Sequence, residues 1–463
     1  MSTWLPDLGR FDGPKYRAIV EAIAADMETG TLAPGTRLPT HRDLAWRLGV
    51  TVGTVARAYA EAERRGLLSG EVGRGTFVRA PGRDEPTLAH YLNEATWQPG
   101  GVVNLSVNRP DGDQGAAQVG PVLARLSRRP DLCNLLAYRF EPLGAHHRAA
   151  GARWLADEGL AVAPERVAVT AGTQQALLAA LAVATNPGDS VAVEEFTYPG
   201  IRSAVALMGR TLLPVAMDAH GILPDEAERA FARGARLLYT IATVHNPLTM
   251  TLAEDRRRAL AAAARRHGAL IVEDGVHRFL DPAAPPPLAA FEPDHCAYLT
   301  TLSKSVSPGL RTAFVVMPPA LRARFDATVG ALSLSLPAVL IEAAAVMIEE
   351  GAAQEIAAAR RREAVARCTL ARDILGARVR SAVPSFNVWL ELAPPWSSGA
   401  FVAEAARRGV SLGPTDTFAV GRPIQDGIRV SVSCPPEREE LRRGLLILAD
   451  MLAAPPVLPG VTV

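Results

Sequence analysis

The chain is almost without lysine. Of its 49 lysine and arginine residues, only Lys15 and Lys304 are lysines, and the other 47 are arginines. Arginine keeps its proton in a protein, whereas a desolvated lysine can become a neutral amine that attacks a carbonyl group and holds it as a Schiff base. Lys304 is therefore a candidate for chemistry, and the alternative is a surface lysine without a role. We expect Lys15 to be a solvated charge or a phosphate contact.

Cysteine and long apolar runs are also scarce. The four cysteines lie far apart without paired spacing, which indicates reduced thiols and neither disulfides nor a zinc site, so we expect no metal. No apolar run approaches the ~18 residues that a membrane span needs, and the N-terminus lacks the pattern of a secretory signal. These absences predict a cytoplasmic protein that does not act at a membrane.

The net charge is small but unevenly spread. A value of +1 argues against a uniformly basic nucleic-acid binder. Residues 31–80, however, hold eight arginines against four acidic residues, and a local excess of this kind attracts DNA. A chain of 463 residues is also longer than one core usually supports, so at least two domains are expected.

The first 80 residues have the pattern of three helices and a hairpin. Apolar residues at helical spacing predict helices at about residues 14–27, 41–48 and 52–65. Thr51, in the turn before the third helix, is able to cap it. Glycines punctuate two extended pieces that end at Val78. The pattern predicts a winged helix-turn-helix domain at residues 11–80, and the proline and glycine content of residues 81–101 is that of a linker.

Residues 102–455 are expected to form a second, larger α/β domain. Apolar runs typical of strands alternate with alanine-rich helices, which predicts a mostly parallel sheet covered on both faces. The runs lie at residues 167–170, 190–193, 237–240, 270–273 and 313–316. Thr251 and Glu254 have the spacing of a capping box at the start of a helix that ends at His267. Short strands near residues 385–391 and 428–433 predict a smaller C-terminal subdomain.

Several polar residues of the N-terminal domain are placed to contact DNA. Thr51, Thr54 and Arg57 occupy the start of the third helix, where side chains reach base edges or phosphates. The full set of expected DNA contacts is Arg37, Thr40, Arg42, Thr51, Thr54, Arg57 and Arg74. The alternative is a helical interaction module whose arginines are solvated.

The N-terminal motifs resemble the GntR family of bacterial DNA-binding domains over the whole length of the domain. They include Leu38-Pro-Thr-His-Arg-Asp-Leu-Ala45, Gly49-Val-Thr-Val-Gly-Thr-Val55 and Gly73-Arg-Gly-Thr-Phe-Val78. In that family the helix after the turn enters the major groove and a glycine-tipped wing approaches the minor groove. The resemblance implies a double-stranded DNA operator as a partner.

Four further segments carry residues that are typical of a ligand site around a reactive lysine such as Lys304. Gly172, Thr173 and Gln174 form a glycine turn between a strand and a helix, where free amides and the helix dipole favour a phosphate. Tyr198 follows a strand and is able to stack on a flat ring. A packed core tyrosine is the alternative for this residue.

Two strand ends and two arginines complete this pattern. Asn246 places an amide at one strand end. Asp274 places a carboxylate at another, where an acid keeps a pyridine nitrogen protonated and the ring electron-withdrawing; a plain helix cap is its alternative. Arg311, seven residues after Lys304, is able to reinforce a phosphate site. Arg429 offers a fork for a substrate carboxylate or for an acid of the protein itself.

In this order, the segments resemble the fold type I aminotransferases, which bind pyridoxal 5′-phosphate (PLP), over roughly residues 100–452. The resemblance implies that Lys304 forms a Schiff base with PLP, that Asp274 pairs with the pyridine nitrogen and that Asn246 contacts the ring hydroxyl. It implies that Tyr198 stacks on the ring, and that Tyr138 reaches into the site of a neighbouring subunit of a homodimer. The remaining residues implied are Gly172, Thr173, Gln174, Thr301, Ser303 and Arg311 for the cofactor, with Arg429 for a substrate carboxylate.

Two positions depart from the aminotransferase pattern. The tyrosine expected shortly after Asp274 is missing, and we expect His277 to replace its phenol as a donor to the ring hydroxyl. The usual Pro-Thr-Gly or Pro-Ser-Gly becomes Pro247-Leu-Thr-Met250, which loses a glycine that permits a tight turn. Cofactor binding is expected to survive both changes.

The order of winged helix, linker and aminotransferase-like domain is that of the MocR subfamily of GntR regulators, which are PLP-dependent transcription factors. The resemblance predicts a regulator that senses PLP itself or an amino compound, such as an amino acid or another amine. One alternative is an active PLP-dependent aminotransferase with a fused DNA-binding domain. The other is a structural DNA-binding dimer whose PLP site is inactive.

Overall fold

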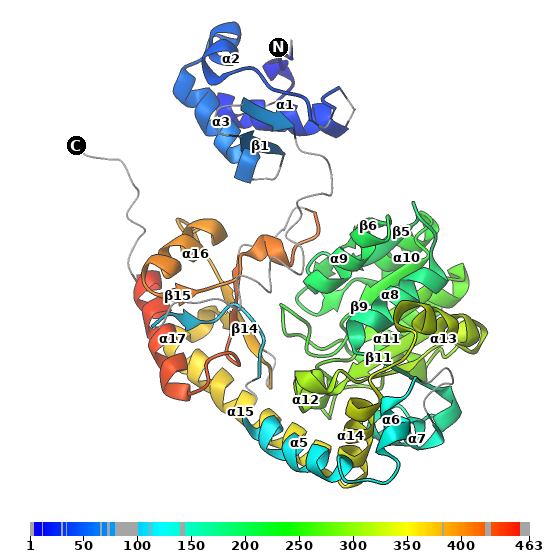
Figure 1. Cartoon of the computed structure of the whole chain (residues 1–463). Helices are drawn as coiled ribbons and strands as arrows, with labels where there is room; N and C mark the ends of the chain where they lie inside the picture. Colours follow the sequence, from blue (N-terminus) through cyan, green and yellow to red (C-terminus); the bar gives the residue numbers. More distant parts are fainter. Residues whose placement is uncertain are drawn as a thin grey trace. The chain divides into compact units, whose positions relative to one another are not determined.

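The computed structural model describes most of the chain (Figure 1). The described residues are 4–11, 13–28, 31–33, 35–64, 67–71, 75–78, 101–110, 113–138, 144–381, 384–421 and 427–453. The chain divides into two compact units, residues 1–87 and 88–463. Of the linker expected at residues 81–101, only Gly101 lies within the described residues.

The N-terminal unit contains a helix-turn-helix and a hairpin. After a 3₁₀ turn at Leu8–Arg10 come α1 (Lys15–Glu28), α2 (His41–Leu48), α3 (Val52–Arg64), β1 (Leu68–Glu71) and β2 (Gly75–Val78), and the two strands pair antiparallel. Ile19, Leu44 and Val55 bring the three helices into one core. Gly49 takes a left-handed backbone with φ of 62° between α2 and α3, which glycine adopts without strain. The expected winged helix-turn-helix is confirmed.

A sheet of seven strands forms the centre of the C-terminal unit. Its order is β4 (Val167–Thr170), β12 (Ala313–Val316), β11 (Cys296–Thr301), β10 (Leu270–Asp274), β9 (Leu237–Thr240), β5 (Ser190–Glu194) and β6 (Thr211–Val215). Of these strands, β12 alone runs antiparallel to its neighbours, so the expected mostly parallel sheet is confirmed. The sequence pattern does not reveal β6, which carries Pro214 at the sheet edge, or β11, which mixes aromatic and hydroxyl residues.

Both faces of this sheet are buried. In β4 and β10, Val169 and Ile271 belong to one apolar core, whereas Ala168 and Val272 belong to a second core on the opposite face. Successive side chains of a strand alternate in this way when helices cover both faces. The helices up to α14 are α5 (Asp113–Leu126), α6 (Leu132–Leu136), α7 (Ala145–Asp157), α8 (Thr173–Ala184), α9 (Pro199–Leu207), α10 (Pro224–Ala232), α11 (Glu254–His267), α12 (Leu302–Ser305), α13 (Pro319–Ser333) and α14 (Ala338–Glu349).

A smaller subdomain with its own apolar core completes the unit. Its elements are α15 (Ala352–Leu375), β13 (Val379–Arg380), β14 (Asn387–Glu391), α16 (Ser398–Arg407), β15 (Val410–Ser411), β16 (Gly427–Ser431) and α17 (Arg438–Ala453). β13, β14 and β16 form an antiparallel sheet. β3 (Val103–Asn104) pairs with β15, so the first described residues of the unit join its last part. A short hairpin, β7 (Met217–Asp218) and β8 (Gly221–Ile222), lies outside both sheets.

The start of α11 differs from the expected capping box. Ala253 is the N-cap residue, and no side chain caps the helix. The hydroxyl of Thr251 instead donates to Asp281 at 3.1 Å and accepts from the backbone N–H of Val244 at 3.2 Å. The predicted capping box was wrong because the Thr251 hydroxyl forms its hydrogen bonds with residues distant in the sequence and not with the start of the helix. Within the residues described, no helix has the length and apolar character to cross a membrane.

Candidate functional site

The residues expected to bind the cofactor follow the carboxyl ends of strands in the seven-stranded sheet. Gly172, Tyr198 and Asn246 lie beyond β4, β5 and β9, Asp274 ends β10, and Lys304 lies in α12 directly after β11. Ligands of open α/β sheets bind at this edge, because the loops that leave the strands border a crevice there. The fold therefore gathers these segments at one edge of one sheet.

Lys304 is partly buried, and its ammonium group donates a hydrogen bond to the backbone oxygen of Asn108. Burial, together with the positive charges of Arg429 and Arg360, lowers the pKa of Lys304 to about 8. Near neutral pH roughly a tenth of such a side chain is an uncharged amine. The uncharged form is the one that attacks an aldehyde.

Asp274 lies among other buried polar groups. One carboxylate oxygen accepts a hydrogen bond from the Tyr239 hydroxyl at 2.7 Å, and the other accepts from the backbone N–H of Val276 at 3.1 Å. Burial raises the pKa of Asp274 in spite of these two donors. No described lysine, arginine or histidine forms an ion pair with this carboxylate. A cationic ring nitrogen would supply the positive charge that such an acid favours.

Arg429, on β16, joins the C-terminal subdomain to the strand-end loops. Its guanidinium donates to the side-chain oxygen of Asn246 at 3.2 Å and to the backbone oxygen of Ser106. The same group lies 4.3 Å from the ring centre of Phe418. The side chain is buried, so Arg429 is held beside Asn246, and its expected role toward a substrate carboxylate stays a prediction.

Of the residues expected at the phosphate, Gly172, Thr173 and Arg311 lie at the N-terminus of α8. Gly172 has a φ of 100°, and a Cβ there would lie 2.5 Å from Nη2 of Arg311, which donates to the backbone oxygen of Ala171 at 3.2 Å. The hydroxyls of Thr301 and Ser303 lie 3.0 Å apart. Thr173 begins α8. Free helix N–H groups, hydroxyls and a guanidinium together suit an anion.

Gln174 and Tyr198 both contact Gly200. The amide nitrogen of Gln174 donates to the backbone oxygen of Gly200 at 3.0 Å. A Cβ at Gly200 would lie 2.1 Å from Cε1 of Tyr198, so the tyrosine ring packs directly on the glycine. Any larger residue at position 200 would displace the ring.

Two other expected site residues have different positions. His277 is buried, with Nδ1 at 3.1 Å from the backbone oxygen of Val244 and with Lys304 and Arg429 among the charges around it. Tyr138 follows α6, and 73% of its surface is exposed. The single chain therefore does not bring Tyr138 into the group around Lys304, and its role toward a second subunit stays a prediction.

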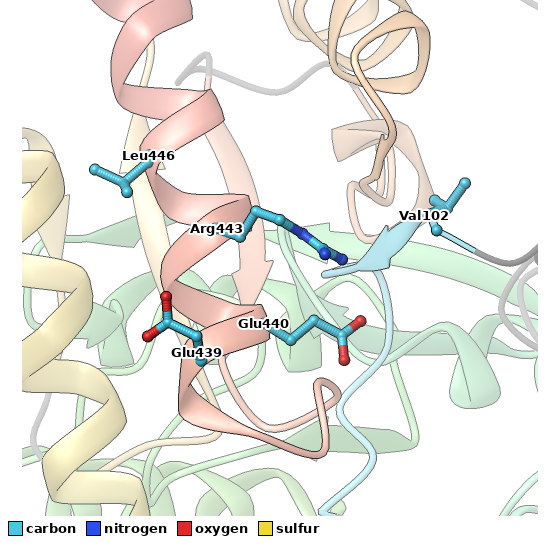
Figure 2. Close-up of a pocket in the computed structure, with 6 residues that line it drawn as sticks. Val102, Glu439, Glu440, Arg443 and Leu446 are labelled. Atoms are coloured by element: carbon cyan, nitrogen blue, oxygen red, sulfur yellow. The ribbon is translucent and has the colours of Figure 1, made fainter.

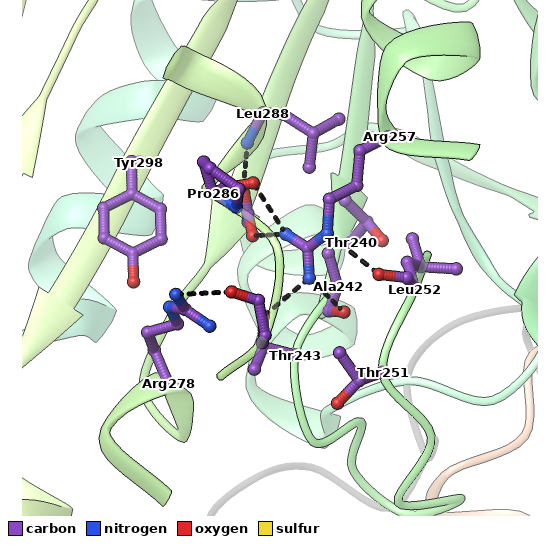
Figure 3. Close-up of polar contacts among 12 residues, drawn as sticks. Thr240, Ala242, Thr243, Thr251, Leu252, Arg257, Arg278, Pro286, Leu288 and Tyr298 are labelled. Atoms are coloured by element: carbon purple, nitrogen blue, oxygen red, sulfur yellow. Dashed lines mark hydrogen bonds and ion pairs between the residues drawn. The ribbon is translucent and has the colours of Figure 1, made fainter. Parts of the chain in front are cut away.

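A buried ion pair supports the loops that carry Asn246 and Asp274. Arg257, on α11, contacts Glu273 at 2.9 Å, and both side chains are fully buried. Arg257 donates further hydrogen bonds, shown in Figure 3, to Ala242 O at 2.7 Å, Thr243 Oγ1 at 2.7 Å and Leu252 O at 3.0 Å. Because Glu273 precedes Asp274, the pair ties the Asp274 strand to the loop of Asn246.

A second buried carboxylate holds the same loop from the side of β5. Glu194 accepts hydrogen bonds from Thr240 Oγ1 at 2.7 Å and Ile241 N at 3.1 Å, and His245 Nε2 lies 3.2 Å away. Arg257 and Glu194 thus hold the loop before Asn246 from two sides. Neither residue is among those predicted to bind the ligand.

Sequence reasoning did not identify Asn108, Tyr239 or Arg360 as neighbours of the site. Tyr239 gave a weak signal, because a tyrosine in a buried aliphatic strand needs a partner for its hydroxyl. Asn108 contacts Lys304 across 196 residues of sequence. Arg360 donates to the backbone oxygens of Lys304 and Val306 from α15. No local pattern marks either of these two contacts.

The residues expected to contact DNA lie on the N-terminal unit. Thr51 caps α3 as expected, since its hydroxyl accepts the N–H of Thr54 at 3.2 Å and lies 2.9 Å from the Thr54 hydroxyl. The guanidinium of Arg57 lies 4.0 Å from the ring centre of Tyr16 on α1. Thr51 and Arg57 are exposed, which leaves the beginning of α3 open to a partner.

The other expected DNA contacts are distributed over α2 and the hairpin. Thr40 caps α2 by accepting the N–H of Asp43 at 3.3 Å. Arg37 crosses the hairpin, where a Cβ at Gly75 would lie 2.7 Å from its Nε. Arg42 is exposed on α2. Arg74 lies outside the described residues, so the structure does not place it.

A surface hollow of about 730 Å³ lies elsewhere in the C-terminal unit (Figure 2). It is lined by Gly101, Val102, Glu439, Glu440, Arg443 and Leu446. None of the residues expected at the cofactor site borders it. In Figure 2, Glu440 and Arg443 extend from α17 toward the segment that carries Val102.

Known families account for both units. Residues 15–78 match the bacterial regulatory proteins of the gntR family, and residues 100–446 match the aminotransferase class I and II family. The chain belongs to the aminotransferase class I and II family. Its gntR domain precedes this aminotransferase domain, which is the arrangement of the MocR subfamily of GntR regulators.

Curated relatives of this MocR-type chain are transcriptional regulators. It is 29% identical over 462 residues, 97% of each chain, to the uncharacterized HTH-type transcriptional regulator YdeF of Bacillus subtilis strain 168. It is 31% identical over 314 residues, 68% of this chain and 70% of the relative, to the vitamin B6 salvage pathway transcriptional repressor PtsJ of Salmonella typhimurium.

The aminotransferase domain also resembles solved enzymes. The crystal structure of LysN, an alpha-aminoadipate aminotransferase from Thermus thermophilus in complex with N-(5′-phosphopyridoxyl)-L-leucine, aligns with a TM-score of 0.69 at 26% identity. The alignment covers 78% of this chain and 94% of LysN. The MocR-type chain therefore combines the fold of a PLP enzyme with a regulator's DNA-binding domain.

Proposed function

We propose that the protein is a PLP-dependent DNA-binding transcriptional regulator that senses PLP or an amino compound at the strand-end site. The gntR domain and the regulator relatives support the DNA-binding part of this function. The named relatives include a repressor of vitamin B6 salvage and PdxR of Corynebacterium glutamicum, a pyridoxine biosynthesis transcriptional regulator. These names support a B6 compound as cofactor or signal.

The residues at the site fit PLP. The carboxylic acid of Asp274 suits a protonated ring nitrogen, and Gly172, Arg311 and the start of α8 suit a phosphate. The side-chain oxygens of Asn108 and Gln174 are buried acceptors without a hydrogen-bond partner in the described protein, so both are open to donors of a ligand. When bound, PLP supplies an aldehyde that bonds reversibly to primary amines and a ring that withdraws electrons.

Each side chain has a defined task toward such a ligand. Lys304 would hold the aldehyde, and its lowered pKa supplies the uncharged amine for this bond. Asp274 would hold a proton on the ring nitrogen, and Tyr198 would pack on the ring. Arg429 would orient the carboxylate of an amino acid. The hydroxyls and the guanidinium expected at the phosphate belong to Thr173, Thr301, Ser303 and Arg311.

One observation carries the sensing part of the proposal. Lys304 and Arg429 donate hydrogen bonds to the backbone oxygens of Asn108 and Ser106. These oxygens belong to a short segment that begins directly after the expected linker, residues 81–101. A ligand that takes either side chain as its partner removes a bond to this segment. Occupancy of the site therefore changes contacts of the chain that leads to the DNA-binding domain.

The experiment compares regulation with turnover in the full-length protein. We would add PLP, a panel of amino acids and a 2-oxo acid, and record both product formation and retention of the DNA upstream of the gene. If the protein is a regulator, it binds that DNA specifically, and the addition of PLP or of one amine changes the amount of DNA bound. Fast multiple turnover without specific DNA retention would replace this function with that of an aminotransferase.

The remaining assignments belong to the same proposal. An aminotransferase also needs the uncharged fraction of Lys304 and a buried acid such as Asp274, so this enzyme activity is the second candidate. We expect a homodimer in the cytoplasm, with Tyr138 of each chain extending toward the site of the other. Sedimentation with and without PLP measures this assembly, and a Tyr138→Ala variant with unchanged PLP affinity would contradict the role of the tyrosine.

A further inference from the structure

His277 is fixed in the site by one hydrogen bond and one ring contact. It lies three residues beyond Asp274, and its Nδ1 is 3.1 Å from the backbone oxygen of Val244. The ring of Phe386 meets the imidazole edge to face, with ring centres 6.0 Å apart. Lys304, Arg429 and His245 are among the charged or titratable groups whose electrostatic effects reach it.

The hydrogen bond determines which ring nitrogen carries the proton. A backbone carbonyl oxygen only accepts hydrogen bonds, so Nδ1 of His277 must be the N–H donor to Val244. A neutral imidazole has one N–H, and its other nitrogen is then a bare acceptor. Burial, followed by the positive charge of Lys304, lowers the pKa of His277 to about 3, which keeps the ring neutral.

The bare nitrogen faces away from Val244, because the two nitrogens of an imidazole point in widely different directions. The side-chain amide of Asn246, two residues after Val244, offers a donor instead of an acceptor. Since the oxygen of Asn246 accepts from Arg429 at 3.2 Å, its NH₂ group remains as a donor. An oxygen that receives a hydrogen bond from Asn246 and faces an acceptor on His277 fits best as a neutral hydroxyl.

We infer that His277 acts toward the cofactor as a hydrogen-bond acceptor, and that its Nε2 keeps the proton on the hydroxyl of the bound pyridine ring. This assignment rests on the proposed PLP site. It reverses the donor role expected from the position of His277 in the sequence. The physical reason is the Val244 carbonyl, which uses the single N–H of the ring.

The test measures the absorbance of bound PLP in the full-length protein. PLP with a neutral ring hydroxyl absorbs mainly in the near ultraviolet, whereas the anionic form absorbs in the visible. We would record the ratio of visible to near-ultraviolet absorbance in the unmodified protein, in His277→Phe and in His277→Tyr. Loss of the acceptor should raise this ratio about three- to tenfold. A phenol donor at the same position should raise it further.

The exposed His220 supplies the matched control, because it lies on the turn between β7 and β8. His220→Phe should leave the ratio unchanged. Equal ratios in the unmodified protein, His277→Phe and His277→Tyr would overturn the acceptor role. Circular dichroism shows whether the substituted proteins are folded.

A second measurement needs no cofactor. Nitrogen NMR of histidine-labelled protein distinguishes the two tautomers of a neutral imidazole, and the signal missing in His277→Phe identifies the residue. An N–H at Nδ1 supports the acceptor assignment, and an N–H at Nε2 overturns it. A protein that takes up no PLP but shows the Nδ1 tautomer would remove the proposed function and leave the tautomer of His277 established.

Discussion

The side chains expected to meet DNA stand on the surface of the N-terminal unit, whereas those expected to meet PLP lie mostly inside the C-terminal unit. Thr51 and Arg57 are exposed, and 3% of Asp274 and 1% of Arg429 are accessible. Exposed charges interact through water and salt, which screen them. Buried groups interact at short range and shift one another's pKa values. The two sets of expected contacts should therefore differ in their sensitivity to salt.

The comparison is tested most strongly by the two lysines. Lys304→Ala should abolish stable uptake of PLP, seen as loss of the absorbance of bound PLP and of the mass added after borohydride reduction, because no other lysine lies in the C-terminal unit. Lys15→Ala is the matched control, since Lys15 begins α1. Lys15→Ala should keep both the absorbance of bound PLP and the added mass. Unchanged absorbance in Lys304→Ala would remove this lysine from its role.

The next largest expected effect is that of salt, which should weaken DNA binding strongly and PLP uptake only slightly. If a dimer neutralises about six to ten phosphates, its DNA affinity falls by about 10³–10⁵ between ~50 and ~200 mM salt. Covalent uptake of PLP at a buried site should change by less than about tenfold over the same range. Filter retention and absorbance titration measure the two quantities. DNA binding that does not respond to salt would contradict the surface interface.

A third prediction compares a buried ion pair with an exposed one. Arg257→Met leaves the carboxylate of Glu273 without its partner inside the protein and should cost about 3–5 kcal/mol of unfolding free energy. Asp43→Asn breaks the surface pair with Arg47, which is 3.0 Å long, and should cost less than about 1 kcal/mol. Urea unfolding measures both.

The double variant Arg257→Met/Glu273→Leu sharpens this comparison. It removes both charges and should recover much of the stability lost in Arg257→Met. Its affinity for PLP should remain lower than that of the unmodified protein, because the loop of Asn246 has lost its anchor. Full affinity in the stable double variant would show that the pair has no positioning role.

The smallest predicted effect is a shift in the pH dependence of the rate of PLP uptake. Lys304 has a pKa lowered to about 8, and only its uncharged form bonds to an aldehyde, so the rate of PLP uptake should rise with pH and level off above about 8. Arg429→Gln removes a positive charge that favours the uncharged amine, so the pKa of Lys304 rises and the curve moves to higher pH. Stopped-flow absorbance measures the rate. A displacement to lower pH would contradict the electrostatic argument.

The sequence predicts those features that depend on local spacing. The helices and hairpin before Val78, the main strands and the position of Lys304 after a strand end all follow from periodicity, glycines and the rarity of lysine. Asn108 and Arg360 do not follow, because they reach Lys304 only after distant segments have packed. Thr251 shows the same limit through a prediction that failed. Its sequence position suits a helix cap, but its hydroxyl donates to the distant Asp281 instead.

The role inferred for His277 illustrates the same limit at the level of a single proton. Its spacing from Asp274 predicts a place at the site, but the nitrogen that carries the proton depends on the backbone oxygen of Val244, 33 residues away. No composition or periodicity encodes this choice. Residue type and spacing thus predict which side chains gather, whereas hydrogen-bond direction requires the folded backbone.

The pairing of β3 with β15 affects the order in which the two units can fold during synthesis on the ribosome. Val103 meets Val410, so the subdomain that contains both cannot be completed until synthesis has nearly finished. The core of the N-terminal unit, in contrast, uses no described residue beyond Val78, and N-terminal domains generally fold first during synthesis. Interrupted translation would therefore release a folded N-terminal unit without the C-terminal unit.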